Sequence, residues 1–507
     1  MSLAIVFSRA QSGIDAPLVT VEVHLSGGLP ALAIVGLPET AVRESRERVR
    51  AAILNAGFEF PLGRVTINLA PAELPKAGGR YDLAIALGIL AASGQLPATR
   101  LRACEFLGEL ALTGELRPVH GVLPAVLRTR DDGRCLIAPL INAAEAALVP
   151  DAPVHGAQHL LEVCAHLAGR AVLPQITCLP PRDNEADDAQ GIDIAEIRGQ
   201  LAAKRALAIA AAGGHNLLMI GPPGAGKTSL ALRFPGILPP MNETEAIETA
   251  TIHSIDTRGF RLEDWRRRPF RTPHHTSSAI ALAGGGSVPQ PGEVSLAHHG
   301  VLFLDELPEF SRHVLEVLRE PLESGRITVS RARRRAEFPA AFQLIAAMNP
   351  CPCGWLGTTD NRCRCTSEQI DRYRARISGP LLDRIDLHVE LPPVDPVALR
   401  QAFDPAAMRS ADIRARVITA RDRQLARDGK PAHRLTPGEI ERSCVLDIAA
   451  MSLLERAAMR FGFSARAHHG ILKVARTIAD LDGADGIEEH HLGEAVGYRV
   501  IDRRLSM

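Results

Sequence analysis

The pattern of apolar and polar positions predicts an α/β protein whose C-terminal part is helical. In the first third of the chain, apolar–polar alternation predicts strands at 18–25, 31–35 and 65–69. Apolar residues at helical spacing predict helices over 39–55 and 81–92. The run at 105–112, followed by Thr113-Gly114, predicts a hairpin. These elements indicate one self-contained α/β domain over residues 1–172.

The rest of the chain divides into three segments. Prolines and then acidic residues over 173–192 indicate a linker. Buried strands are predicted by short apolar runs at 217–220, 301–304 and 342–348, within a second α/β domain over 193–395, named the motor domain for the motifs described below. Helical periodicity then predicts a lid over 396–507, with helices at 411–428, 439–444, 449–461, 467–480 and 488–496.

Composition narrows the class of protein. The chain has 507 residues, 46% of them hydrophobic and 23% charged, which is typical of soluble globular proteins. The formal net charge is zero, so any nucleic-acid site must be a local patch. We find neither a signal peptide nor an apolar run that spans a bilayer. The nine cysteines are mostly scattered, which argues against a disulfide framework and for a reducing compartment, so we expect a cytoplasmic protein without a membrane partner.

One glycine-rich stretch predicts a nucleotide site. It has the P-loop pattern G-x-x-x-x-G-K-[ST] and comprises Gly221, Pro222, Pro223, Gly224, Ala225, Gly226, Lys227 and Thr228. The predicted strand at 217–220 precedes it, and Ser229 opens a predicted helix behind it. We expect backbone N–H groups to surround the phosphates of a nucleoside triphosphate, Lys227 to reach the β- and γ-phosphates, and Thr228 to bind Mg²⁺.

A second motif predicts the hydrolytic groups. The apolar run 301–304 delivers Asp305 and Glu306, which is a Walker B pattern. We expect Asp305 to hold Mg²⁺ and Glu306 to orient or deprotonate the attacking water. A buried strand that ends in a polar turn is the alternative interpretation, and the P-loop upstream argues against it.

Arginines cluster between two alternating runs, 326–331 and 334–338. This pattern predicts a β-hairpin with a basic tip that grips a phosphate backbone through Arg331, Arg333, Arg334 and Arg335. A solvated charged surface is the competing interpretation.

Four cysteines lie in one short loop, 351–365. Cys351, Cys353, Cys363 and Cys365 form two C-x-C pairs, which predict a structural Cys₄ zinc site, with unmetallated thiols as the alternative. Four histidine pairs (His274-His275, His298-His299, His468-His469 and His490-His491) are not expected to bind metal, because sequence neighbours do not share a helix or strand face.

Together these motifs resemble the magnesium-chelatase-like AAA+ ATPases, and closely the ComM (YifB-type) family. The resemblance extends to Pro273-His-His-Thr-Ser-Ser278, to Gly284-Gly-Gly286 and to Asn349-Pro-Cys-Pro-Cys-Gly354. It implies a homo-hexameric ATPase that drives DNA branch migration or unwinding. In the family this serves homologous recombination of incoming DNA during natural transformation, and recombination proteins are candidate partners.

The resemblance also implies individual roles. Gln200 would lie beside the adenine, which favours ATP; Asn349 would place the attacking water. Arg384 would reach the γ-phosphate bound by a neighbouring subunit, whereas Arg466 would touch that of its own subunit. The N-terminal domain would have a Lon-protease-like fold. Where Lon-type proteases carry a catalytic serine and lysine, this chain has Arg80 and Leu123, so we expect no proteolysis, and Arg80 to be a surface or binding residue.

Three other functions compete. A chelatase motor that inserts metal with partner subunits shares the nucleotide site and the ring, but gives no reason for the arginine hairpin or the cysteines. An ATP-dependent protease requires the missing dyad. A protein-remodelling ATPase would act on a protein partner without any effect of DNA.

Overall fold

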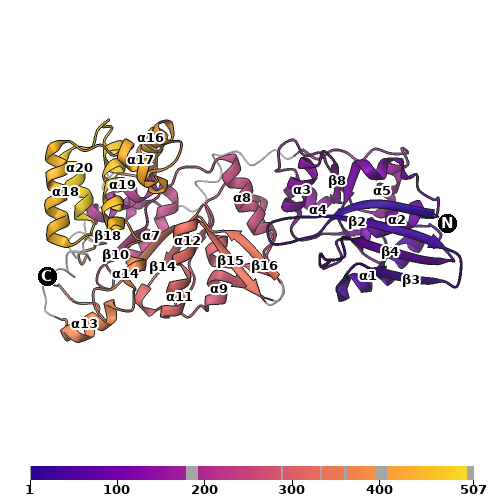
Figure 1. Cartoon of the computed structure of the whole chain (residues 1–507), viewed down its shortest axis with the longest axis horizontal. Coiled ribbons are helices and arrows are strands. Elements are labelled where there is room, and N and C mark those ends of the chain that lie inside the picture. The colour runs from indigo at the N-terminus through magenta and orange to yellow at the C-terminus, as the bar shows by residue number, and fades with distance from the viewer. Residues whose placement is uncertain are drawn as a thin grey trace.

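The computed structural model describes residues 2–177, 192–286, 289–331, 334–358, 362–394 and 408–499. Figure 1 shows the N-terminal α/β domain at one end of an elongated molecule, the motor domain in the middle and the helical lid at the other end. Most of the predicted linker, 178–191, lies outside the described residues. No helix among the described residues is long and apolar enough to cross a membrane.

The N-terminal domain is built on a seven-stranded mixed sheet, in the order β3-β4-β2-β1-β5-β8-β9. Its strands are β1 Ser2–Arg9, β2 Leu18–Ser26, β3 Ala31–Val35, β4 Arg64–Ala70, β5 Cys104–Phe106, β8 Cys135–Pro139 and β9 Val154–Ala157. Its helices are α1 Thr40–Asn55, α2 Asp82–Ala92, α3 Val122–Asp131, α4 Leu140–Ala146 and α5 Leu160–Leu167. The strands and helices predicted over the first 92 residues are confirmed.

Two expectations for this domain are wrong. The segment 105–112 is not one arm of a hairpin, because β5 joins the large sheet and only β6 (Glu109–Leu110) and β7 (Leu116–Arg117) pair as a hairpin. The scattered cysteines also argue against disulfides, but Cys104 and Cys135 form one. These residues face each other on the parallel strands β5 and β8 although 31 positions separate them in the chain, so their spacing carried no signal.

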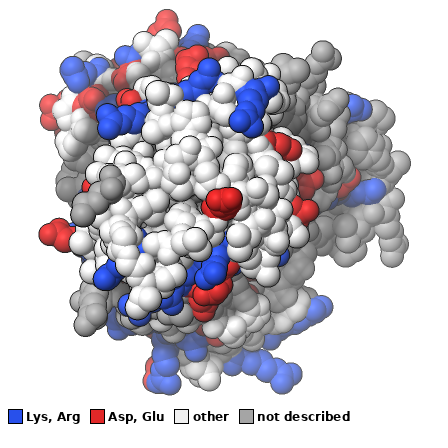
Figure 2. Space-filling view, turned by 90° about the vertical axis from the view of Figure 1, so that its right-hand side faces the viewer, with Lys and Arg blue, Asp and Glu red and all other residues white. Residues whose placement is uncertain are grey.

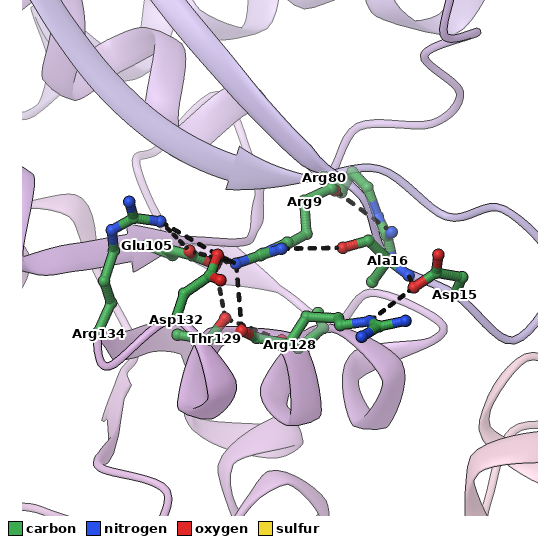
Figure 3. Close-up of polar contacts among 10 residues, drawn as sticks. Arg9, Asp15, Ala16, Arg80, Glu105, Arg128, Thr129, Asp132 and Arg134 are labelled. Carbon is green, nitrogen blue, oxygen red and sulfur yellow. Dashed lines mark hydrogen bonds and ion pairs between the residues drawn. The ribbon is translucent and has the colours of Figure 1, made fainter.

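Arg80 is neither a surface residue nor available for binding. It is 5% exposed and donates hydrogen bonds to the carbonyls of Arg9, His120 and Gly121 (Figure 3 shows Arg80 beside Arg9). Arg80 therefore reaches the loop that immediately precedes Leu123, and Leu123 is buried. The two positions assigned to the protease dyad thus lie close together, and neither holds a nucleophile or a base.

An ion-pair network with a buried centre at Arg9 and Glu105 fixes the loop between β1 and β2. Arg9 pairs with Glu105 (Nε to Oε2, 2.6 Å) and with Asp132, and donates to the carbonyl of Ala16 (Figure 3). Arg128 pairs with Asp15 of the same loop at 2.8 Å. The network orders residues 10–17, whose Gly13 packs against Ala336 and Phe338 of the motor domain. The N-terminal domain is therefore tied to the base of the arginine hairpin.

The motor domain is a five-stranded parallel sheet in the order β11-β14-β17-β10-β18. The strands are β10 Leu217–Ile220, β11 Phe270–Arg271, β14 Val301–Leu304, β17 Gln343–Met348 and β18 Leu387–Glu390. The three predicted strands of this domain are confirmed. β10, β14 and β17 are buried along their whole length, as the near-continuous apolar runs of a sheet covered on both faces require.

Helices and short strands surround that sheet. They are α6 Leu201–Gly213, α7 Lys227–Arg233, α8 Glu243–Ser254, α9 Ala279–Ala283, α10 Glu293–Leu296, α11 Arg312–Val317, α12 Arg319–Ser324, α13 Ser367–Arg374, α14 Gly379–Leu382, β12 Gly284–Gly285 and β13 Gln290–Pro291. The predicted arginine hairpin is confirmed as β15 (Arg326–Arg331) paired with β16 (Arg334–Pro339). Its underside packs into the motor through Ile327, Val329 and Phe338.

The lid consists of the helices predicted from the periodicity. They are α16 Ser410–Asp428, α17 Pro437–Ser443, α18 Ile448–Phe461, α19 Ala465–Leu481 and α20 Glu489–Gly497. The buried face of α19 packs with α6 of the motor in one continuous apolar core. Asp193 ties the two domains, since its carboxylate accepts from both the backbone N–H and the hydroxyl of Ser410.

Candidate nucleotide-binding site

The P-loop lies where the sequence predicts it, between β10 and α7. The helix begins at Lys227, two residues earlier than expected. Gly226 caps it with φ +87°, a left-handed conformation that favours glycine. The loop lies at the carboxyl edge of the parallel sheet, where doubly wound folds bind ligands, and the first turn of α7 turns its N–H groups toward that edge.

Lys227 connects the P-loop to the end of β17. Its Nζ donates to the carbonyls of Gly221 (2.6 Å) and Pro222 (3.0 Å) and to Oδ1 of Asn349 (3.0 Å). Burial lowers the pKa of Lys227, and the nearby Asp305 and Glu306 oppose that shift. The ammonium is thus held among acceptors in a half-buried site that can take phosphate oxygens. Asn349 is one of these acceptors.

The expected metal ligands also meet. Thr228 Oγ1 donates to Asp305 Oδ2 over 2.7 Å, and the backbone N–H of Glu306 donates to Asp305 Oδ1 over 2.9 Å. The Glu306 backbone is left-handed (φ +54°), and its side chain is 55% exposed, toward the site rather than into the core. A hydroxyl and a carboxylate in this arrangement are hard oxygen donors of the kind that Mg²⁺ prefers.

His275 lies beside Glu306, a position that was not predicted for it from the sequence. Its Nδ1 is 3.6 Å from Glu306 Oε2. In the sequence, His275 stood out only as a member of one of the histidine pairs and as part of the motif at 273–278. The sequence did hold one signal for this position, since His275 follows strand β11 closely. β11 is the parallel neighbour of β14, and parallel neighbours end at the same edge of a sheet.

Gln200 occupies the turn before α6, with φ +52°. Its Nε2 donates to the carbonyls of Ala225 in the P-loop (3.2 Å) and Pro392 after β18 (2.9 Å). Gln200 therefore joins the P-loop to the segment that follows the sheet, at the side of the site.

The two expected arginines lie at the opposite, amino edge of the sheet. Arg384 follows α14 and precedes β18, and its carbonyl accepts from Asn216, directly before β10. Arg466, at the start of α19, and Arg384 both pair with Glu323. The length of β10, about 13 Å at about 3.3 Å per residue, separates this edge from the P-loop. The structure therefore does not bring Arg466 to its own subunit's nucleotide site, which corrects the expected role in the same subunit.

A cleft of about 1480 Å³ opens at this amino edge. Asn216, Gly300 and Gln343, which precede or begin three parallel strands, line its floor. Glu323, Arg466 and lid residues such as Lys473 form its walls. Sequence reasoning missed Glu323, because only the fold brings it to the two arginines.

The four cysteines of the loop 351–365 converge. The sulfur atoms of Cys351, Cys353 and Cys363 are 3.4–3.7 Å apart, and Cys365 joins them within 4.8 Å. A tetrahedral zinc site with Zn–S bonds of about 2.3 Å places its sulfurs about 3.8 Å apart, so the donor set fits this ion. The backbone N–H of Trp355 and the neighbouring thiols lower the pKa of Cys353 to about 6.

The cysteine loop packs against the P-loop. Gly354 has φ +83°, and a Cβ at this position would lie 2.6 Å from Cδ of Pro223. Only a glycine fits both the backbone conformation and the contact.

Two histidine pairs do converge, contrary to expectation. His298 and His299 both approach Glu248 of α8 (Nε2 to Oε2, 3.3 and 2.6 Å), and His490 and His491 lie near Asp482. His298 Nδ1 accepts the backbone N–H of Ala341, so its Nε2 carries the proton and donates to Glu248. That nitrogen is then not a metal ligand, and the first cluster is a hydrogen-bonded support of the helix.

Of the four arginines proposed for DNA contact, the structure describes the side chain of Arg335. Arg335 is exposed on β16. Arg333 lies outside the described residues, and for Arg331 and Arg334 the structure describes the backbone, where they pair across the hairpin. At the base, Arg326 pairs with Glu337 at 2.7 Å.

Comparison with known proteins matches all three domains to one family. "Subunit ChlI of Mg-chelatase" matches residues 21–142, "Magnesium chelatase, subunit ChlI" matches 193–399, and "Magnesium chelatase, subunit ChlI C-terminal" matches 407–499. The chain is 52% identical over 506 residues to competence protein ComM of Haemophilus influenzae, covering 100% of this chain and 99% of that protein. It is 50% identical over 505 residues to uncharacterized protein YifB of Escherichia coli, covering 100% and 98%. It is 24% identical over 349 residues to the magnesium-chelatase 38 kDa subunit of Rhodobacter capsulatus, covering 64% of this chain and 91% of that subunit.

Proposed function

This chain belongs to the ComM (YifB-type) family of magnesium-chelatase-like AAA+ ATPases, and on that premise we propose that it is an ATP-driven motor that moves DNA as a hexameric ring. Branch migration or unwinding during recombination of incoming DNA is the activity proposed, and the similarity to a competence protein supports it. The observation that carries the proposal is that one chain combines a nucleotide site, two arginines remote from it and a basic hairpin.

The residues at the carboxyl edge fit ATP and Mg²⁺. The P-loop amides and Lys227 would hold the β- and γ-phosphates, and Thr228 with Asp305 would hold Mg²⁺, which neutralises charge that develops during phosphoryl transfer. Glu306 would take the proton of the attacking water, and Asn349 would orient that water. Gln200 would lie beside the base.

The position of Arg384 and Arg466 supports a shared site. A residue at the amino edge of the sheet contributes to hydrolysis only if it faces the P-loop of a neighbouring subunit. We therefore place both arginines in trans, where they would stabilise the charge of the transition state. Arginines supplied in this way are worth roughly 10³–10⁵ in rate. A closed ring gives every site such a neighbour.

The hairpin is the element best suited to grip DNA. Its apolar underside anchors it in the motor, and Arg326 and Arg335 are exposed on its strands. The outer end of the N-terminal domain is less suited to binding DNA phosphates, because the centre of that face carries few charged side chains (Figure 2). Arginine on a rigid, projecting hairpin suits contacts to phosphates rather than to bases.

We further propose that the cysteine loop holds structural zinc. All four thiols would be ligands, which leaves no open position for catalysis. Through Gly354 and Pro223, the loop would brace the P-loop from outside the sheet.

A chelatase motor is the second candidate. The match to the 38 kDa subunit of R. capsulatus over most of that subunit favours it. Stimulation of ATP turnover by tetrapyrrole-bearing partner subunits, and not by DNA, would support this alternative.

The test is steady-state ATP turnover with and without single-stranded and branched DNA. We compare the wild type with a hairpin variant in which Arg333, Arg334 and Arg335 are all changed to alanine. In the control variant, Arg456 and Arg460, which are exposed on α18, are changed to alanine. DNA stimulation that the hairpin variant loses, while its basal turnover and the control persist, supports the motor. Absence of stimulation by any DNA contradicts it.

A further inference from the structure

The Glu323 carboxylate holds both arginines of the amino edge. Its Oε2 pairs with Nη2 of Arg384, and its Oε1 lies 3.5 Å from Nη1 of Arg466. Arg384 is 9% exposed and also donates to the carbonyl of Pro380 over 2.6 Å. Both arginines hold the pKa of the Glu323 carboxyl below its usual range. One carboxylate thus forms ion pairs with two guanidinium groups, one from the motor domain and one from the lid.

Glu323 is also close in sequence to the hairpin. It lies near the end of α12, and β15 begins at Arg326. Ser324 clamps the intervening turn, because its hydroxyl donates to the carbonyl of Glu320 and accepts the backbone N–H of Arg326. The turn between Glu323 and β15 is therefore short and hydrogen-bonded.

We propose that Glu323 is the positioning residue that couples the nucleotide of the neighbouring subunit to the arginine hairpin. Glu323 and the γ-phosphate of that nucleotide would bind Arg384 and Arg466 in turn. This inference rests on the proposed function, since it takes both arginines to act in trans. In a subunit whose neighbour holds no triphosphate, Glu323 neutralises the arginines and keeps them oriented. When a neighbour presents a γ-phosphate, the arginines move to that anion and Glu323 is released.

Electrostatics makes the exchange reversible. The Glu323 side chain is 58% exposed in the single subunit, so its release does not leave an unpaired charge buried within that subunit. Because the Glu323 carboxylate is exposed, water weakens its ion pairs, and a phosphate with more than one negative charge competes for the arginines. The carboxylate cannot stay in place beside a phosphate because like charges repel. Capture of the arginines therefore removes the two ion pairs that hold α12, at the foot of the hairpin, to Arg384 and to the lid.

The test compares Glu323→Gln with the wild type and with Glu320→Gln. Glu320 is on the same helix, is exposed, and has no ion pair among the described residues. We measure the ATP concentration for half-maximal turnover without DNA and the factor by which DNA stimulates turnover. We expect E323Q to lower the half-saturating ATP concentration about two- to fivefold, the fold-change that corresponds to loss of an exposed ion pair. We also expect it to reduce the DNA stimulation factor by at least about half, while E320Q changes neither.

A third arm shows that Glu323 acts through the arginines. In an Arg466→Ala background, E323Q should have a smaller effect on half-saturating ATP, because one of its two partners is gone. A lesion that merely destabilises the fold would not improve apparent ATP affinity, so the direction of the change identifies the role. The same values for E323Q and E320Q would overturn the inference. Lack of DNA stimulation in the wild type would instead contradict the DNA motor, and the ATP comparison would still decide whether the exchange occurs.

Discussion

The hydroxyl of Thr228 donates a hydrogen bond to the Asp305 carboxylate over 2.7 Å, although 77 positions separate the two residues in the chain. The fold produces this contact because β10 and β14 are parallel strands of one sheet, with β17 between them, and end at the same edge. Loops that follow such strands deliver their polar groups to a common place. The nucleotide site is therefore assembled by topology as well as by motif.

The two adjacent carboxylates at the end of β14 should have different roles. Asp305→Asn removes a charge from the metal site, so we expect a higher Mg²⁺ requirement for turnover. Glu306→Gln should retain ATP binding and lower turnover roughly 10²–10⁴-fold, because the amide takes no proton from water. Nucleotide binding by fluorescence and turnover at several Mg²⁺ concentrations separate these effects. Loss of ATP binding in E306Q would contradict the assignment.

Gly354 should be required for an intact P-loop. Gly354→Ala places a Cβ 2.6 Å from Pro223 and imposes a left-handed backbone on alanine, so we expect weaker ATP binding and a loss of about 1–3 kcal/mol of stability. Gly357→Ala is the matched control, because Gly357 is also left-handed (φ +81°) but a Cβ there meets nothing within 4 Å. ATP titration and thermal unfolding of both variants measure the difference. Equal effects of the two substitutions would mean that the contact with Pro223 does not matter.

Zinc should bind at one ion per chain and stabilise the nucleotide site. We expect Cys363→Ser to abolish stoichiometric zinc and to lower both thermal stability and ATP affinity, since the loop braces Pro223. Cys164→Ser, at a buried cysteine of the N-terminal domain, should retain zinc. Metal analysis of the purified variants is the measurement. Wild-type protein that contains no zinc after expression in zinc-supplemented medium would contradict the zinc site.

Stability should decrease as the pH falls below about 6.5. His388 is fully buried on β18, and burial together with the nearby Arg499 lowers its pKa to about 3. The unfolded chain protonates this histidine at its ordinary pKa of about 6.5, whereas the folded chain keeps it neutral. The unfolded state therefore binds more protons between these values, and each pH unit costs about 1.4 kcal/mol of folding free energy from this group.

The variant His388→Leu tests that origin of the pH dependence. Its free energy of unfolding, measured in urea at pH 7 and pH 5.5, should fall less on acidification than that of the wild type, by about 1.4 kcal/mol. His490→Leu, at an exposed histidine of the lid, is the control and should keep the wild-type dependence. An unchanged pH dependence in H388L would mean that other groups cause the effect.

Local patterns predicted much of this molecule. The P-loop, the Walker B carboxylates and the arginine hairpin each lie within one short stretch, so spacing and periodicity carried their signal. The helical lid was equally readable, because each amphipathic helix marks its own buried face. These elements specify their structure within a few residues of chain.

Relationships across the fold were not predictable in the same way. The pairing of Glu323 with Arg384 and Arg466 depends on how the lid packs on the motor, and no short-range pattern encodes it. The disulfide between Cys104 and Cys135 depends on which strands are neighbours. The charge of Arg80 predicts an exposed residue, yet three backbone carbonyls accept hydrogen bonds from its guanidinium inside the protein.

The shared catalytic site is tested most directly by mixing two inactive variants. Lys227→Ala removes phosphate binding and keeps Arg384, whereas Arg384→Ala keeps the P-loop and removes the arginine. In a mixed ring with random order, about a quarter of the interfaces pair an intact P-loop with an intact Arg384. The account predicts that ATP turnover reappears on mixing, at up to about a quarter of the wild-type rate. Turnover by R384A alone at the wild-type rate, or a mixture as inactive as its components although mass measurements show mixed rings, would contradict it.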